Sequence, residues 1–233
     1  MNDPEPKKVG DWITHGMNDP APERYYDWIL WKLRQEKKME IKHHPIFQSG
    51  YSEIFLDFDN DKLEKIILDN SDKKFSDDPN NTGIEDSGLP PDDKNILELQ
   101  SAFEEVVTEV INLDENYVVD TISMWGHIIP PNGSTMYHSH KINGMFPSWG
   151  MTEPGMSCVY YVNVPENSGD LSFVTNAYGN EHITKVKSET GKLVIFPCYV
   201  PHMTGTNKSG KNRLSISANF IVKPKNARGE KNV

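Results

Sequence analysis

The sequence has few cysteines, a modest apolar content and no long hydrophobic run. Its 233 residues include two cysteines, Cys158 and Cys198, in apolar strand-like runs without the spacing of a zinc knuckle. Buried thiols are therefore favoured over a disulfide. Only 36% of the residues are hydrophobic, and no 18-residue apolar stretch or basic-then-apolar leader occurs. We expect a soluble, cytoplasmic protein with no membrane association, folded around the core that its aromatic residues allow.

Positive charge is scarce, and the negative charge is unevenly spread. The net charge is −10, yet residues 53–120 hold 20 acidic residues against 5 lysines, whereas residues 121–222 hold 5 acidic against 7 basic residues. A general nucleic-acid binder would need a basic face, so that class is excluded. The mildly basic second half suits a small anionic co-substrate.

The chain divides into three parts by texture. Residues 1–50 form an extension with a 16-residue repeat and a helix over 23–38, and residues 223–233 form a basic tail. Between them, residues 51–222 are expected to form one β-rich domain with supporting helices. Helical spacing predicts supporting helices over 61–70 and 95–113, the latter capped by Asp92 or Asp93. Residues 69–94 are expected to be a loop, and short strands are expected at 53–58, 117–130, 157–164, 170–174, 182–186, 191–196 and 213–222. Helices followed by many short strands predict a mainly β protein with flanking helices, a jelly-roll sandwich or barrel.

Three histidines have the chemistry of an iron site. His138 and His140 stand two residues apart, and His202 follows a strand and a proline break. Three neutral imidazoles can hold a divalent metal of the iron type. One imidazole can instead orient its neighbour without binding the metal itself. His138 is favoured over His140 as a direct ligand. His127, in a strand, is interpreted as a core or rim histidine rather than a ligand.

An arginine and a serine suggest an anion site. Arg213 and Ser215 share one face of a strand, and a guanidinium beside a hydroxyl suits the far carboxylate of a small diacid. Tyr160 and Tyr161 are adjacent in another strand, so one of them faces the pocket and the other packs outside. The sequence alone does not decide which.

These motifs, in this order, resemble those of the 2-oxoglutarate- and Fe(II)-dependent oxygenases. The resemblance is carried by residues 157–163, 169–173, 191–197, His202 and 213–217, and it is nearest to the small prolyl-hydroxylase-like branch of bacteria and phages. It implies a cupin-like double-stranded β-helix and a bacterial or phage-infected cell. It also implies iron ligation by His138 and His202 with a third ligand near His140, and 2-oxoglutarate held by Arg213, Ser215 and a strand tyrosine.

The expected function is a dioxygenase that hydroxylates a C–H bond and releases succinate and CO2. Its cofactors would be Fe(II) and 2-oxoglutarate, and its partners O2 and a small-molecule or peptide substrate. Most of the family has Asp or Glu where His140 stands, so a three-His cupin-like dioxygenase without 2-oxoglutarate remains an alternative. A non-catalytic jelly-roll binding module is another. The aromatic stretch 141–156 is interpreted as a lid or substrate contact.

Overall fold

The structure is a computed structural model. It describes residues 42–46, 49–71, 85–113, 115–140, 155–177 and 180–224. The repeat and helix predicted within residues 1–50 largely lie outside these ranges, as does most of the 141–156 stretch. The division into three parts at residues 50 and 222 therefore stays a prediction. Among the described residues, no helix is both long enough and apolar enough to span a membrane.

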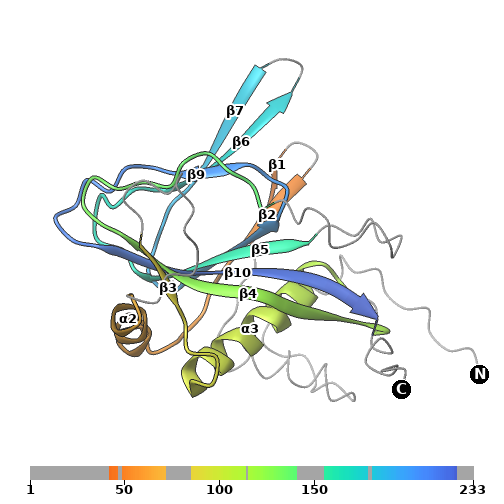
Figure 1. The fold of residues 1–233 in the computed structure, drawn as a ribbon. Coiled ribbons are helices and arrows are strands. Elements are labelled where there is room, and N and C mark those ends of the chain that lie inside the picture. Colours follow the sequence, from red (N-terminus) through yellow and green to blue (C-terminus); the bar gives the residue numbers. More distant parts are fainter. Residues whose placement is uncertain are drawn as a thin grey trace, which may run out of the picture. The chain divides into compact units, whose positions relative to one another are not determined.

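The described chain folds into two antiparallel sheets (Figure 1). The larger has seven strands in the order β1-β2-β8-β5-β10-β4-β3, and the smaller has the order β7-β6-β9. Strand order departs from chain order in both sheets, as in a jelly roll. The strands are β1 (Lys42–Ile46), β2 (Ser49–Phe55), β3 (Glu85–Gly88), β4 (Tyr117–Ile129), β5 (Met156–Asn163), β6 (Leu171–Ala177), β7 (Asn180–Val186), β8 (Lys192–Pro197), β9 (His202–Thr204) and β10 (Arg213–Pro224). This mainly β architecture confirms the predicted fold class.

Two helices lie against one face of the larger sheet (Figure 1). The helices α2 (Asn60–Asp69) and α3 (Lys94–Val110) begin and end within a few residues of their predicted bounds. Asp93 caps α3, because its carboxylate accepts the backbone N–H groups of Asn95 and Ile96. The sheet closes tightly on α2: a Cβ at Gly126 would lie 3.1 Å from the Ile67 side chain.

One expectation about a connecting segment was wrong. The segment 69–94 was expected to be a loop throughout, but β3 pairs with β4 at the edge of the larger sheet. Its four residues, Glu-Asp-Ser-Gly, show no alternation of apolar and polar side chains, so they carry no strand signal. An edge strand this short forms because its backbone pairs with the neighbouring strand. The three residues of β9 are likewise too few to show an alternating pattern. The antiparallel pairing of β1 with β2 was not predicted either.

The core between the two sheets is aromatic and aliphatic. Tyr51 stacks on Phe173 at 5.3 Å between ring centroids, and Phe173 meets Phe196 edge-on at 5.0 Å. Leu171, Val186, Val194 and Val200 complete this buried cluster. His202 begins β9 at its margin, so the core forms one wall of the site described next.

Candidate metal and co-substrate site

Backbone hydrogen bonds bring the histidine segments together. His138 and His202 exchange both hydrogen bonds, with N–H···O distances of 2.9 and 2.8 Å, as an isolated antiparallel bridge. The backbone N–H of His140 donates to the carbonyl of Cys198 at 2.9 Å. The segment after β4 therefore runs beside β9, and these three backbone hydrogen bonds join residues far apart in the sequence.

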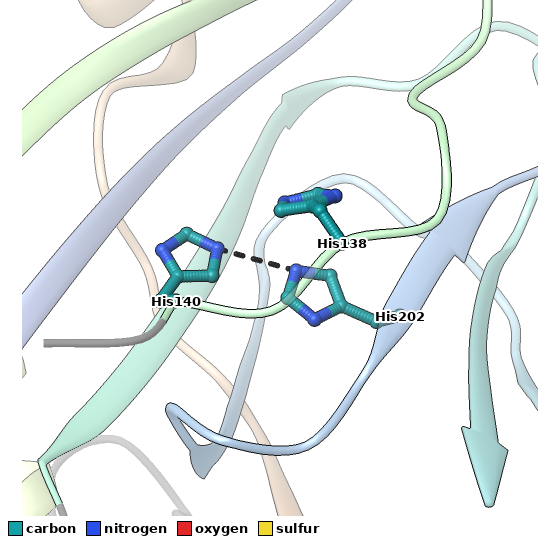
Figure 2. A group of neighbouring side chains, drawn as sticks. All are labelled: His138, His140 and His202. Carbon is teal, nitrogen blue, oxygen red and sulfur yellow. Dashed lines mark hydrogen bonds between the residues drawn. The ribbon is translucent and has the colours of Figure 1, made fainter. Parts of the chain in front are cut away.

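The three imidazoles face one another (Figure 2). Their ring centroids are 4.3 Å apart for His138 and His202, and 5.1 Å apart for each of the other two pairs. Nε2 of His140 lies 3.3 Å from Nε2 of His202. One nitrogen from each ring can be chosen so that all three lie within 4.8 Å of one another. The structure thus brings together the three predicted residues.

Backbone carbonyls fix which nitrogen carries hydrogen in two of the rings. Nδ1 of His202 lies 2.9 Å from the Val200 carbonyl, and Nδ1 of His138 lies 2.8 Å from the Met136 carbonyl. A carbonyl oxygen only accepts, so both Nδ1 atoms carry hydrogen, and each of these rings, when neutral, presents the lone pair of Nε2. Burial and neighbouring histidines lower the pKa of His202 to about 3 and that of His140 to about 4. Both rings are therefore neutral at pH 7.

This arrangement fits a divalent transition-metal ion. Neutral imidazoles whose lone pairs converge repel one another until a cation lies between them, and imidazole is a ligand that Fe(II) accepts. No carboxylate lines the described part of the pocket around the three rings. A metal here would have nitrogen donors alone from the described residues.

Arg213 lies in the same pocket and lacks a partner of opposite charge. Its side chain is 2% exposed, and Nη1 donates to the carbonyls of Gly169 at 2.7 Å and Ser168 at 3.4 Å. Among the described residues no carboxylate forms an ion pair with it, and its buried Nε finds no acceptor. Burial lowers its pKa, with Tyr161 and Asp170 acting in the opposite direction. A buried cation of this kind is costly unless an anion binds beside it.

The structure settles which strand tyrosine faces the pocket. Tyr161 lines it, and the Arg213 guanidinium lies 6.0 Å from the centre of the Tyr161 ring. Tyr160 points to the other face of the sheet, where its hydroxyl donates to Asn60 Oδ1 at 2.9 Å. Tyr160, one of the two residues expected to hold the co-substrate, is therefore a helix-packing residue. Ser215 is buried and also lines the pocket.

Two residues of β4, Trp125 and His127, lie beside the histidine cluster, and the sequence did not predict this arrangement. His127 lines the pocket, and its Nε2 accepts from Trp125 Nε1 at 2.7 Å. The Trp125 ring in turn stacks on His140 at 5.8 Å and 28°. His127 is not part of the converging group, which agrees with its interpretation as a rim histidine. The alternation of Trp125 with His127 was the available signal for this arrangement.

Comparison with known proteins identifies the family of this region. Residues 123–219 match the model of the family described as "Putative 2OG-Fe(II) oxygenase". This part of the chain therefore resembles the 2OG-Fe(II) oxygenases. The match runs through β4, β5, β6, β7, β8, β9 and most of β10, and it includes every residue of the histidine cluster and Arg213. The family's cofactors are Fe(II) and 2-oxoglutarate. A search of curated proteins found no match.

Solved structures of 2OG oxygenases share the fold. One is an α-ketoglutarate-dependent carbocyclase of nogalamycin biosynthesis, at TM-score 0.58 and 13% identity, covering 74% of this chain and 79% of that one. A Pseudomonas putida prolyl-4-hydroxylase matches at 0.53 and 19%, covering 74% and 92%. HygX from Streptomyces hygroscopicus, with nickel and 2-oxoglutarate bound, matches at 0.53 and 12%, covering 74% and 82%. At these identities the matches establish a double-stranded β-helix.

Proposed function

We propose that this protein is a dioxygenase that hydroxylates a C–H bond of its substrate. In this proposal His138, His140 and His202 hold Fe(II) through their Nε2 atoms. Arg213, with Ser215 and Tyr161, binds the distant carboxylate of 2-oxoglutarate. The bound iron and co-substrate supply the oxidising chemistry, consuming O2 and releasing succinate and CO2.

One observation carries the proposal: the unpaired buried guanidinium shares a pocket with the three converging imidazoles. Either feature alone has a structural explanation. Together they would provide a metal site and an anchor for a dicarboxylate in the same pocket. A planar guanidinium can meet both oxygens of a carboxylate, and Arg213 is held in place by two backbone carbonyls.

The remaining pocket residues position the groups and exclude water. Phe196 packs edge-on against the His202 ring at 4.7 Å, and Leu171 and Val159 add apolar surface to the lining. Apolar walls strengthen the attraction between Arg213 and a bound carboxylate by keeping the local dielectric low. The protein thus contributes by holding the metal ligands and Arg213 in fixed positions and by keeping water away from them.

A third imidazole in place of a carboxylate changes the charge of the site. With three neutral ligands the metal centre keeps one more positive charge than with two imidazoles and one carboxylate. The excess favours binding of a doubly negative co-substrate. A three-His dioxygenase that needs no 2-oxoglutarate would use the same metal site, but it would not explain the buried Arg213. A purely structural jelly roll would explain neither Arg213 nor the three converging imidazoles.

The test is succinate release from 2-oxoglutarate by the full-length protein. We expect Fe(II)-dependent, O2-dependent release that rises when the right substrate is added. The solved structures that share this fold include prolyl hydroxylases, so proline-containing peptides are the first class to screen, followed by free amino acids and other small metabolites. Product mass increased by one oxygen atom supports hydroxylation. Absence of succinate under all conditions, with iron bound, contradicts the proposal.

A further inference from the structure

Trp125 lies beside one of the three imidazoles of the histidine cluster. Its indole stacks on the His140 ring at 5.8 Å between centroids and 28° between planes, within the range of offset-stacked aromatic pairs. Trp125 is 6% exposed. Strand β4 is paired on both sides at this point, with Ser217 of β10 and Gly88 of β3 opposite Trp125. The indole is therefore attached to a backbone that two neighbouring strands hold in place.

A hydrogen bond fixes the indole further. Nε1 of Trp125 lies 2.7 Å from Nε2 of His127. An indole N–H only donates, so the direction of this bond is determined: Trp125 donates and His127 accepts. The two residues stand two positions apart on β4, so their side chains share a face, and their rings meet edge to face at 5.6 Å and 73°. The sheet fixes the position of the indole, and the hydrogen bond fixes its plane.

The three imidazoles are held in different ways. Backbone carbonyls lie at the Nδ1 atoms of His138 and His202. His140 meets His202 through a ring edge, with the two Nε2 atoms 3.3 Å apart (Figure 2), and its ring face stacks on Trp125. Rotation of the His140 ring about its Cβ–Cγ bond would turn Nε2 away from the other two rings. The indole on the ring face opposes that rotation.

We propose that Trp125 is a positioning residue for the metal site. Its indole, held by His127, keeps the His140 ring in the plane that directs Nε2 toward the ion. The inference rests on the proposed function, because it assumes that His140 is a ligand. Trp125 is not among the residues that line the pocket, so it acts only through His140. It determines how tightly and at what angle the third imidazole binds.

Metal titration tests the role without reference to turnover. Full-length wild type, Trp125→Leu and Trp125→Phe are titrated with Co(II), following the visible absorption of the bound ion. We expect Trp125→Leu to bind about 2- to 10-fold more weakly, as the loss of one aromatic pair implies, and Trp125→Phe, which keeps a ring, to fall between it and wild type. Phe103→Leu is the matched control, because it removes a buried ring that packs on Tyr160 at the other face of the sheet. It should leave affinity unchanged.

The spectrum of the bound ion distinguishes positioning from a general loss of stability. At saturating Co(II), the visible band of Trp125→Leu should differ in position and intensity from that of wild type, because the third nitrogen then binds at another angle. The band of Phe103→Leu should coincide with that of wild type.

Two variants of His127 serve in case Trp125→Leu does not fold. His127 is not one of the converging donors, so loss of a ligand does not explain an effect there. His127→Gln keeps an acceptor for the indole N–H and should keep wild-type affinity and band. His127→Leu removes the acceptor, and both should change as in Trp125→Leu. Wild-type affinity with an unchanged band in folded Trp125→Leu or folded His127→Leu overturns the proposal while leaving the proposed function intact. Failure of wild type to bind Co(II) overturns both.

Discussion

The two faces of the larger sheet share the same strands but have opposite characters. Along β10, the pocket-lining residues Arg213, Ser215 and Ser217 alternate with Leu214, Ile216 and Ala218, which are buried on the other side of the sheet. Helices α2 and α3 cover that face, where Tyr160 packs on Phe103 at 6.0 Å between ring centroids. The helix-covered face is apolar and satisfied. The opposite face carries the unpaired Arg213 cation and lines the pocket into which the three imidazoles converge, so this face gives up stability for binding.

The largest expected effect follows from removing the buried cation. We expect Arg213→Met to weaken 2-oxoglutarate binding by about 100-fold or more, because a buried carboxylate would lose the guanidinium that pairs with it. Metal affinity should change little, because Arg213 is not among the converging donors.

Thermal unfolding of the same variant sharpens the comparison. Replacing an unpaired buried charge with an apolar side chain is often neutral or stabilising, so the melting temperature without 2-oxoglutarate should not fall. Arg213→Lys is the control that keeps a charge but loses the fork, and intermediate affinity is expected. A marked drop in stability with unchanged 2-oxoglutarate affinity would make Arg213 a structural residue.

The next effect concerns the metal. His202→Ala should weaken Fe(II) binding strongly, because it removes one of the nitrogen atoms that bind the metal. The loss should exceed the roughly 10- to 100-fold typical of removing a residue that only hydrogen bonds to a metal ligand. His140→Asp should retain metal, because a carboxylate can take the vacated position. Metal content measured anaerobically on purified protein separates the two. His182 on β7 is exposed and outside the cluster, so His182→Ala serves as control.

On the helix-covered face, the prediction is reversed. Phe103 is fully buried, and Phe103→Ala should lower the free energy of unfolding by about 3–5 kcal/mol, through lost burial and a cavity. The affinity of the folded fraction for 2-oxoglutarate should be unchanged. Chemical denaturation and calorimetric titration check the two halves. Loss of affinity in a variant that remains folded would mean that the two faces are not independent.

The smallest effect separates the adjacent tyrosines. Tyr160→Phe removes a hydrogen bond to Asn60 and should cost about 1 kcal/mol of stability without affecting the co-substrate. Tyr161→Phe removes a buried hydroxyl from the pocket and should weaken 2-oxoglutarate binding several-fold with little loss of stability. The same change at neighbouring positions thus gives opposite results. Identical behaviour of both variants would contradict the assignment of faces.

Periodicity and short motifs predicted most of the fold. Helices α2 and α3 and seven of the strands were predicted from repeating apolar positions and turn residues, signals that lie within each segment. Strands β3 and β9 have no such signal, because their pairing partners determine them. The histidine pair and His202 were predicted from residue chemistry, and the structure places them together.

Other features of the site depend on contacts that no local pattern encodes. The choice between Tyr160 and Tyr161 needed the register of β5 against β10, which contains an irregularity between Leu214 and Ser215. The stacking of Trp125 on His140 joins two segments whose approach is set by β9.

The most direct test of the central claim is anaerobic calorimetric titration of 2-oxoglutarate into the Mn(II)-loaded protein. We predict one molecule bound per chain, with binding greatly weakened both by removal of the metal and by Arg213→Met. If 2-oxoglutarate binds equally well without the metal and without Arg213, or does not bind at all, the histidine cluster and the buried arginine do not form one site.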